Sequence, residues 1–187
     1  DVIKFCDGFS KLIKTGKCVI GKDTRTTGEM IERLVSATML ERGIDVYNLG
    51  IVPTPVVFRK AKEMGAGIII TSSHNPLEWN GLKFIIDGRG ITEEELEIVK
   101  NERNPIRTNI GKEIITKSNY ISDAVSIIGK LEKTQHVVVD IGGGSAKEIA
   151  PRLLEEIGCQ VETINDELEG CSRGPDPTSD KLTELIN

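Results

Sequence analysis

The sequence has no long apolar run, little excess charge and few aromatic residues. No stretch approaches the roughly 20 apolar residues that span a bilayer, and the first residues lack the apolar core of a secretory signal. The 187 residues include 24 Lys or Arg and 29 Asp or Glu, a formal net charge of -5, which offers no general attraction for nucleic acid or an anionic membrane. We therefore expect a cytoplasmic protein that binds neither nucleic acid nor membrane.

Cysteine is also sparse, and its spacing is not that of a metal or redox site. No two cysteines lie at the Cys-x-x-Cys spacing common in zinc and redox sites; the four are Cys6, Cys18, Cys159 and Cys171. We expect reduced thiols with a structural role.

The pattern that is present alternates strands with helices. Three consecutive isoleucines in 66–71 indicate a strand buried on both faces. Thr26 with Glu29 fits a capping box at a helix start, and Thr92 with Glu95 fits another. The other expected elements are strands at 17–20, 45–49 and 83–86 and helices at 1–15, 26–42, 56–64 and 93–100. This order predicts an α/β fold, a layered α/β/α domain with a mixed sheet.

A charged segment with weak periodicity, 101–111, is the best candidate for a domain boundary. We expect a first domain at 1–111 and the start of a second, similar domain at 112–187. That second part should begin another βαβ unit, with elements at 120–128, 136–140, 146–157 and 160–164. Because the chain starts at Asp1 rather than methionine and ends in an apparently helical stretch, we expect a fragment.

The loop after the buried strand carries the most reactive side chains. It places Ser72, Ser73 and His74 at the carboxyl end of a sheet, where open α/β proteins bind ligands. Asn75 and Pro76 then restrict the chain to extended or turn geometry. From the residues alone, a structural turn that merely ends the strand is about as good an interpretation.

A serine hydrolase is a weaker interpretation of the same loop. Neighbours in an extended chain point to opposite sides, so adjacency gives Ser73 no hydrogen bond to His74. The loop has no Gly-x-Ser-x-Gly elbow, and the other histidine, His136, opens a strand that looks buried.

Three glycines at 142–144 follow another expected strand. They expose backbone donors that an anion could use, as in sugar kinases and other actin-like ATPases. The actin-like turn continues into a hairpin, whereas 146–157 reads as an amphipathic helix with Pro151 in its first turns. A close strand-to-helix turn is the better interpretation, and a sugar-kinase-like ATPase is a distant alternative.

Four segments, in order, resemble the α-D-phosphohexomutase family. Residues 71–76, Thr-Ser-Ser-His-Asn-Pro, resemble its Thr-Ala-Ser-His-Asn-Pro phosphoserine loop, with Ser72 where alanine is common. Residues 80–83 are similar to its Asn-Gly-x-Lys element, 21–25 to its Gly-Arg-Asp-x-Arg turn and 53–55 to its Pro-Thr-Pro loop. The resemblance continues into the second part at 137–144, 150–154 and Pro175-Asp176-Pro177, so it covers essentially the whole chain.

The resemblance implies a phosphohexomutase, which interconverts 6-phospho and 1-phospho hexoses or hexosamines. Ser73 would carry the phosphoryl group, and its phosphate would be a ligand of Mg²⁺, a cation that prefers oxygen. The substrate would be a sugar phosphate, and a hexose 1,6-bisphosphate would be intermediate and activator. Transfer of this kind depends on positioning and charge neutralisation.

The same resemblance assigns roles to the neighbours of the serine. Lys83 is the best candidate for proton transfer or charge stabilisation, and His74 is a second donor to phosphate or substrate. Arg25 could offer donors to the phosphoserine region, although a solvated turn arginine is nearly as good an interpretation. Asn75 and Asn80 are expected to brace the loop.

Several parts of the family have no counterpart in this sequence. These are its Asp-Gly-Asp-x-Asp metal loop, its sugar-recognition loop and its C-terminal phosphate-binding domain. We therefore expect the isolated chain to be inactive, and neither the hexose nor the oligomeric state follows from the sequence. The rival from another class is a non-catalytic α/β binding module.

Overall fold

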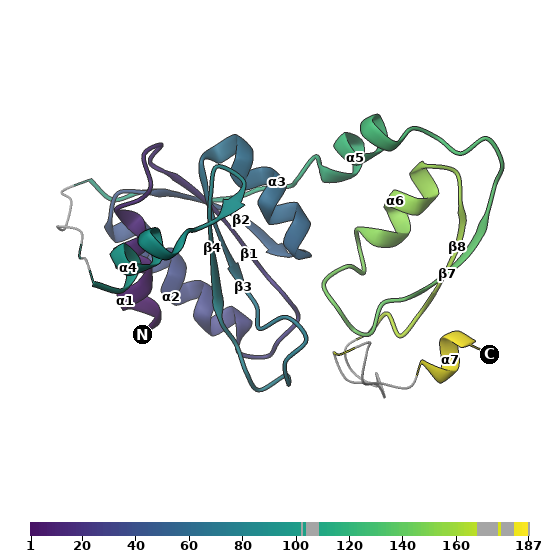
Figure 1. The fold of residues 1–187 in the computed structure, drawn as a ribbon, viewed down its shortest axis with the longest axis horizontal. Helices are drawn as coiled ribbons and strands as arrows, with labels where there is room; N and C mark the ends of the chain where they lie inside the picture. The colour runs from purple at the N-terminus through teal and green to yellow at the C-terminus, as the bar shows by residue number, and fades with distance from the viewer. Residues whose placement is uncertain (102, 104–108, 168–175, 177–181, 187) are drawn as a thin grey trace.

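The computed structural model describes the chain apart from residues 102, 104–108, 168–175, 177–181 and 187. Two units are visible, a larger N-terminal one around a mixed sheet and a smaller C-terminal one, joined through α5 (Figure 1). The linker residues 102 and 104–108 and two residues of the proline-rich loop, Pro175 and Pro177, lie outside the described part.

The larger unit is built on a sheet with the strand order β5-β4-β3-β1-β2-β6. Strands β1, β2, β3 and β6 pair in parallel, while β4 runs antiparallel to both β3 and β5. The strands are β1 (Lys17–Lys22), β2 (Asp45–Ile51), β3 (Ala66–Ile70), β4 (Leu82–Ile86), β5 (Arg89–Gly90) and β6 (Glu113–Ile115). The predicted α/β fold with a mixed sheet is confirmed.

Helices cover both faces of this sheet. The helices are α1 (Val2–Ser10), α2 (Gly28–Glu41), α3 (Thr54–Met64) and α4 (Glu93–Asn101). Ile68 and Ile70 of β3 pack in the apolar cluster formed with α1, α2 and α4, whereas Ile69 packs in the cluster formed with α3. Every residue of β3 is buried, which confirms the strand expected to be covered on both sides.

One predicted capping box is present and the other is wrong. Thr92 Oγ1 accepts a hydrogen bond from the Glu95 amide at 3.2 Å, and Glu95 Oε2 accepts one from the Thr92 amide at 2.8 Å. Thr26 caps nothing, because α2 begins at Gly28, whose amide donates to the Arg25 carbonyl. The N-cap of α2 is therefore Thr27, one residue further along than the capping pattern predicts.

The first helix is also shorter than predicted. It ends at Ser10 rather than near Gly16, and the Ser10 hydroxyl donates to the Asp7 carbonyl. The amides of residues 11–13 then bond to carbonyls three residues back, so the chain tightens before it reaches β1.

Glu95 makes the start of α4 sensitive to acid. The Arg89 guanidinium and the Thr92 amide hold the pKa of Glu95 well below its ordinary value, at about 2. A lowered pKa stabilises the fold above the ordinary glutamate pKa, and this contribution is lost as the pH falls from about 4 to about 2.

We therefore expect Glu95→Gln to lower the melting temperature by a few degrees near neutral pH and by much less near pH 2. Thermal unfolding followed by circular dichroism at both pH values is the measurement. Glu94→Gln, an exposed neighbour in the same helical turn, is the control. An equal destabilisation by Glu95→Gln at both pH values would contradict this assignment.

The smaller unit has the predicted βαβ connectivity. Strand β7 (His136–Asp140) pairs in parallel with β8 (Gln160–Ile164), and α6 (Ala150–Glu156) connects them. The other helices are α5 (Tyr120–Ile128) and α7 (Thr183–Ile186). Helix α6 begins four residues later than expected. His136 is exposed rather than buried, because β7 and β8 form a sheet of two strands among the described residues.

The first sheet continues past the expected boundary at residue 111. Tyr47 of β2 pairs with Ile114 of β6, and Glu113 Oε1 accepts hydrogen bonds from Ser36 Oγ and Asn48 Nδ2 at 3.2 and 3.0 Å. These bonds to buried side chains attach β6 to the larger unit. The division into domains at 1–111 and 112–187 remains a prediction. Strand β6 follows that boundary in sequence but pairs with β2 of the larger unit.

The described cysteines are free thiols. Cys6 and Cys18 are fully buried and Cys159 is half-buried, while Cys171 lies outside the described residues. Burial raises the pKa of Cys6 to about 12 and that of Cys18 still further, which keeps both thiols protonated and unreactive. Among the residues described, no helix has the length and apolar character to cross a membrane.

Candidate active site

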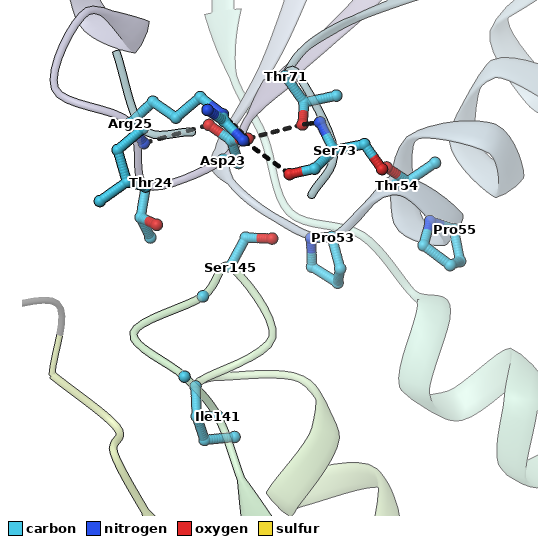
Figure 2. Close-up of a pocket in the computed structure, with 13 residues that line it drawn as sticks. Asp23, Thr24, Arg25, Pro53, Thr54, Pro55, Thr71, Ser73, Ile141 and Ser145 are labelled. Carbon is cyan, nitrogen blue, oxygen red and sulfur yellow. Dashed lines mark hydrogen bonds and ion pairs between the residues drawn. The ribbon is translucent and has the colours of Figure 1, made fainter. Parts of the chain in front are cut away.

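A cavity of about 400 Å³ lies at the carboxyl edge of the first sheet, between the two units (Figure 2). This volume falls in the range of small-molecule sites. The larger unit contributes the turn after β1, the start of α3 and the loop after β3, and the smaller unit contributes the turn after β7. The lining residues are Asp23, Thr24, Arg25, Pro53, Thr54, Pro55, Thr71, Ser73, Leu77, Ile141, Gly142, Gly144 and Ser145.

Parallel pairing explains why separate segments meet here. Strands β1 and β3 are adjacent and end in register, with Lys22 opposite Ile70. The polar turn after β1 and the serine loop after β3 therefore leave the sheet side by side, and the Asp23 amide donates to the Ile70 carbonyl.

Ser73 is held in a backbone conformation that a serine rarely adopts. Its φ is 58°, in the left-handed region, which costs about 1 to 3 kcal/mol for a residue with a side chain. The Ser73 amide donates to Thr71 Oγ1 at 2.9 Å, and the serine side chain is exposed in the cavity. The surrounding contacts must therefore hold the loop against its local preference.

Arg25 supplies most of that restraint. Its guanidinium donates to the carbonyls of four loop residues, with distances of 2.7 Å to Ser73 and 2.8 Å to Asn75. The other two carbonyls belong to Pro76 and Trp79, and the remaining N–H of Arg25 donates to Asp23 Oδ2. All five guanidinium N–H groups are thus used inside the protein.

This arrangement decides between the two sequence-based interpretations of Arg25, because its guanidinium donates to the serine loop. The residue is 5% exposed, so it is not a solvated turn arginine. It lies beside Ser73, as expected, but it has no N–H left to offer a phosphate. Its position identifies it as a clamp on the serine loop.

Asp23 and Thr71 complete the clamp, and sequence reasoning missed both. Thr71 Oγ1 donates to Asp23 Oδ2 at 2.6 Å and accepts from the Ser73 amide, so a continuous chain of hydrogen bonds runs from Arg25 through Asp23 to Ser73. The sequence signal was an Asp-x-Arg turn after a strand next to β3, which is recognisable only once the strand order is known.

His74 lies closer to Ser73 than the sequence analysis allowed. Its Nδ1 is 3.4 Å from Ser73 Oγ, long for a hydrogen bond but within reach after a small movement. The expectation that the two side chains diverge assumed an extended chain. It is wrong because the left-handed conformation of Ser73 turns the chain at this residue.

The two asparagines brace the loop, as expected. Asn75 Nδ2 donates to the Ser72 carbonyl at 2.8 Å. Asn80 Nδ2 donates to Thr27 Oγ1 at 3.0 Å, and its Oδ1 accepts from the Gly81 amide, which ties the end of the loop to the start of α2. Both side chains are used in holding the backbone.

Lys83 does not line the Ser73 cavity. It lies on β4 opposite Ile69, its side chain is exposed, and it borders a separate hollow together with Asn80 and Phe58. The structure thus brings His74 and Arg25 to Ser73 but leaves Lys83 on a neighbouring surface. A role for Lys83 in proton transfer remains a prediction.

The glycine turn forms the opposite wall of the cavity, and its donors are not free. Gly142 and Gly143 have φ values of 58° and 63°. Their amides donate to Asp140 Oδ1 and to the Asn165 carbonyl, and the Gly144 amide donates to the Ile141 carbonyl. The expectation of exposed anion donors at the three glycines is therefore wrong. The turn leads to α6 and then to a parallel strand, not into the hairpin of an actin-like ATPase.

The described residues do not form a metal site by themselves. They contain no group of three or more His, Cys, Asp or Glu side chains able to hold a metal ion. The acidic residue in the cavity, Asp23, already accepts hydrogen bonds on both carboxylate oxygens from Arg25 and Thr71. A cation at Ser73 would need ligands beyond these side chains.

The sequence profile of phosphoglucomutase/phosphomannomutase, alpha/beta/alpha domain I, matches residues 2–110. The chain belongs to the phosphoglucomutase/phosphomannomutase family. The match contains the whole serine loop and its clamp, from Asp23 to Asn80. It supports the resemblance to phosphohexomutases read from the four sequence segments.

Curated relatives in this family are named phosphoglucosamine mutase. The chain is 37% identical over its whole length to the enzyme from Methanococcus vannielii, of which it covers 44%. It is 39% identical over 91% of its length to the enzyme from Methanococcus maripaludis, of which it covers 41%. The chain thus spans less than half the length of these relatives.

Solved structures of phosphoglucomutase/phosphomannomutase proteins share the fold. A family protein from Burkholderia thailandensis matches 99% of the chain and 44% of its own with a TM-score of 0.87 and 24% identity. A putative phosphomannomutase from Thermus thermophilus matches 89% of the chain and 41% of its own with a TM-score of 0.73 and 22% identity. At these identities the likeness establishes the fold.

Proposed function

We propose that this chain carries the phosphoserine part of a phosphohexomutase that interconverts 6-phospho and 1-phospho hexosamines, with Ser73 as the phosphoryl carrier. The observation that carries the proposal is the restraint on Ser73. A serine with an exposed hydroxyl is held in a strained backbone conformation by a buried arginine whose five donors are all used. Such restraint is what an in-line phosphoryl transfer requires of its carrier.

The proposed reaction has two transfers at the same oxygen. In the first, the bond between phosphorus and Ser73 Oγ breaks while a bond forms to a hydroxyl oxygen of the sugar phosphate. The proton of that hydroxyl leaves to a base, and Ser73 Oγ takes up a proton. The product is a hexose 1,6-bisphosphate. After the bisphosphate has turned round, its other phosphoryl group returns to Ser73 Oγ, which gives up its proton to a base, and the leaving sugar oxygen takes up a proton.

His74 is a titratable side chain beside the hydroxyl of Ser73. With Nδ1 3.4 Å from Ser73 Oγ, it can donate to an oxygen of the phosphoserine or exchange the proton of the sugar hydroxyl. Lys83 would need the substrate or a movement of the loop to bring its amine to the cavity. We therefore assign His74 the contact with the serine and keep Lys83 as a second candidate base.

Mg²⁺ belongs to the proposal only through Ser73. The phosphate of Ser73 would offer it one oxygen ligand, and the described residues provide no carboxylate cluster for the others. The described part of the chain therefore does not form a complete magnesium site, and no step above is assigned to the metal.

The hexosamine is proposed from the names of the relatives. Four relatives that are 37 to 39% identical to this chain are named phosphoglucosamine mutase. The test is ³¹P NMR of a full-length protein carrying this chain, given hexose 1,6-bisphosphate and one of glucosamine, glucose or mannose 6-phosphate. Fastest conversion of glucosamine 6-phosphate supports the proposal. Failure to convert any of the three would favour a non-catalytic binding module.

A further inference from the structure

Three hydroxyl groups line the Ser73 cavity without a hydrogen-bond partner inside the described part of the chain. They belong to Thr24, Thr54 and Ser145, which come from the turn after β1, the start of α3 and the turn after β7. Figure 2 shows Thr24 and Ser145 directed into the space between the two units, and Thr54 lines the same cavity as Ser73. All three side chains are half-buried.

The charged groups of the cavity are already neutralised. Among its lining residues, the cation is Arg25 and the anion is Asp23, and they are bonded to each other and to the serine loop. No lining side chain offers a free cationic donor to a phosphate. The polar groups left for a ligand are therefore neutral hydroxyls, each able both to donate and to accept.

Each hydroxyl is carried by a restrained backbone. Thr24 lies between the two clamp residues, and the Arg25 amide donates back to Asp23 Oδ1 at 3.1 Å. Thr54 is the first residue of α3, between two prolines. Ser145 follows a turn whose three glycine amides are all bonded internally. Little conformational freedom remains to be lost when a ligand binds.

We propose that Thr24, Thr54 and Ser145 bind the sugar hydroxyls next to the one that exchanges phosphate with Ser73. The cavity then takes the neutral, hydroxyl-bearing end of the hexose phosphate, and the phosphate that is not being transferred lies outside it. The inference rests on the proposed function and adds residues from both units to sugar recognition. Ser145 makes the second unit a part of the binding site.

The test measures binding of two probes, glucosamine 6-phosphate and inorganic phosphate, to the 187-residue chain by ¹⁵N NMR titration. Thr24→Val, Thr54→Val and Ser145→Ala each remove one hydroxyl with little change in shape. We expect each to raise the Kd for glucosamine 6-phosphate about three- to tenfold, the worth of one hydrogen bond, without changing that for inorganic phosphate.

Ser126→Ala is the matched control, because the Ser126 hydroxyl donates to the Asp123 carbonyl away from the cavity. It should leave both Kd values unchanged. Unchanged binding of glucosamine 6-phosphate in all three cavity variants would overturn the inference. So would equal losses for both probes, or no binding of the sugar phosphate to the unmodified chain.

Phosphorylation of Ser73 by hexose 1,6-bisphosphate, followed in the same variants of a full-length protein, separates this inference from the function. If Ser73 is phosphorylated and the three hydroxyls prove irrelevant to sugar binding, the inference fails and the mutase stands. If the hydroxyls bind the sugar and Ser73 never accepts phosphate, the contacts stand and the mutase fails.

Discussion

Ser73→Ala is expected to lower the mutase rate of a full-length protein carrying this chain by about 10⁴-fold or more, the usual scale for loss of a covalent carrier. The reason is geometric. Ser73 is the serine of its loop whose hydroxyl lines the cavity, and the clamp that sets its direction acts on the backbone, so it survives the substitution. A steady-state assay with glucosamine 6-phosphate and hexose 1,6-bisphosphate measures the loss.

The adjacent serine provides a matched control. Ser72 Oγ accepts a hydrogen bond from Asn75 Nδ2 at 3.3 Å and does not line the cavity. Ser72→Ala also restores the alanine common at this position in the family loop, so it should keep the rate within a few-fold. Retained activity in Ser73→Ala together with loss in Ser72→Ala would move the carrier to Ser72 and contradict the account.

Arg25→Met is expected to lower kcat by about 100-fold or more, although Arg25 touches neither phosphate nor sugar in this account. Its loss frees four loop carbonyls at once, and a carrier displaced by about 1 Å can lose two orders of magnitude in rate. The loop is exposed, so its freed carbonyls can bond to water. The free energy of unfolding should therefore fall by less than the activation free energy of the reaction rises.

Two further variants distinguish a clamp from a general destabilisation. Arg25→Lys keeps the charge but has three donors in place of five, so it should not restore the rate. Arg33→Met removes an exposed arginine of α2 that pairs with Glu29, and it should behave like the unmodified protein.

Fluorescence anisotropy provides a readout of the loop itself. The chain has one tryptophan, Trp79, and its carbonyl is one of the four that Arg25 holds. In Arg25→Met the anisotropy of Trp79 should fall as the loop gains freedom. An unchanged anisotropy with an unchanged kcat would show that Arg25 does not position Ser73.

Much of the fold and the place of Ser73 in the cavity could be predicted from sequence because their signals are local. The isoleucine run of β3 marks a strand covered on both sides, and the loop that follows such a strand lies at the edge where ligands bind. The motif around Ser73 then adds the chemistry. These inferences need only residues within a few positions of one another.

The role of Arg25 could not be read in the same way. The four carbonyls it holds lie 48 to 54 residues further along the chain. Their approach depends on β1 and β3 being neighbours, which the sequence order of the strands does not reveal. The pattern Gly-Lys-Asp-Thr-Arg, taken alone, is equally compatible with a solvated turn.

The prediction of free amides in the glycine turn was wrong for a related reason. Its sequence predicts exposed amides. In the structure these amides donate to the side chain of Asp140 and to the carbonyl of Asn165, which lies beyond β8. The placement of Ser145 opposite Ser73 depends on how the two units meet, which no local pattern encodes. The residues that the sequence missed are thus those whose partners belong to other elements.

The most direct test of the account locates the phosphate. A full-length protein carrying this chain is incubated with hexose 1,6-bisphosphate, digested, and analysed by peptide mass spectrometry, with Ser73→Ala and Ser72→Ala treated in parallel. We expect one phosphate per chain on Ser73, kept in Ser72→Ala and absent from Ser73→Ala. An unphosphorylated Ser73, or a phosphate on Ser72 in its place, would contradict it.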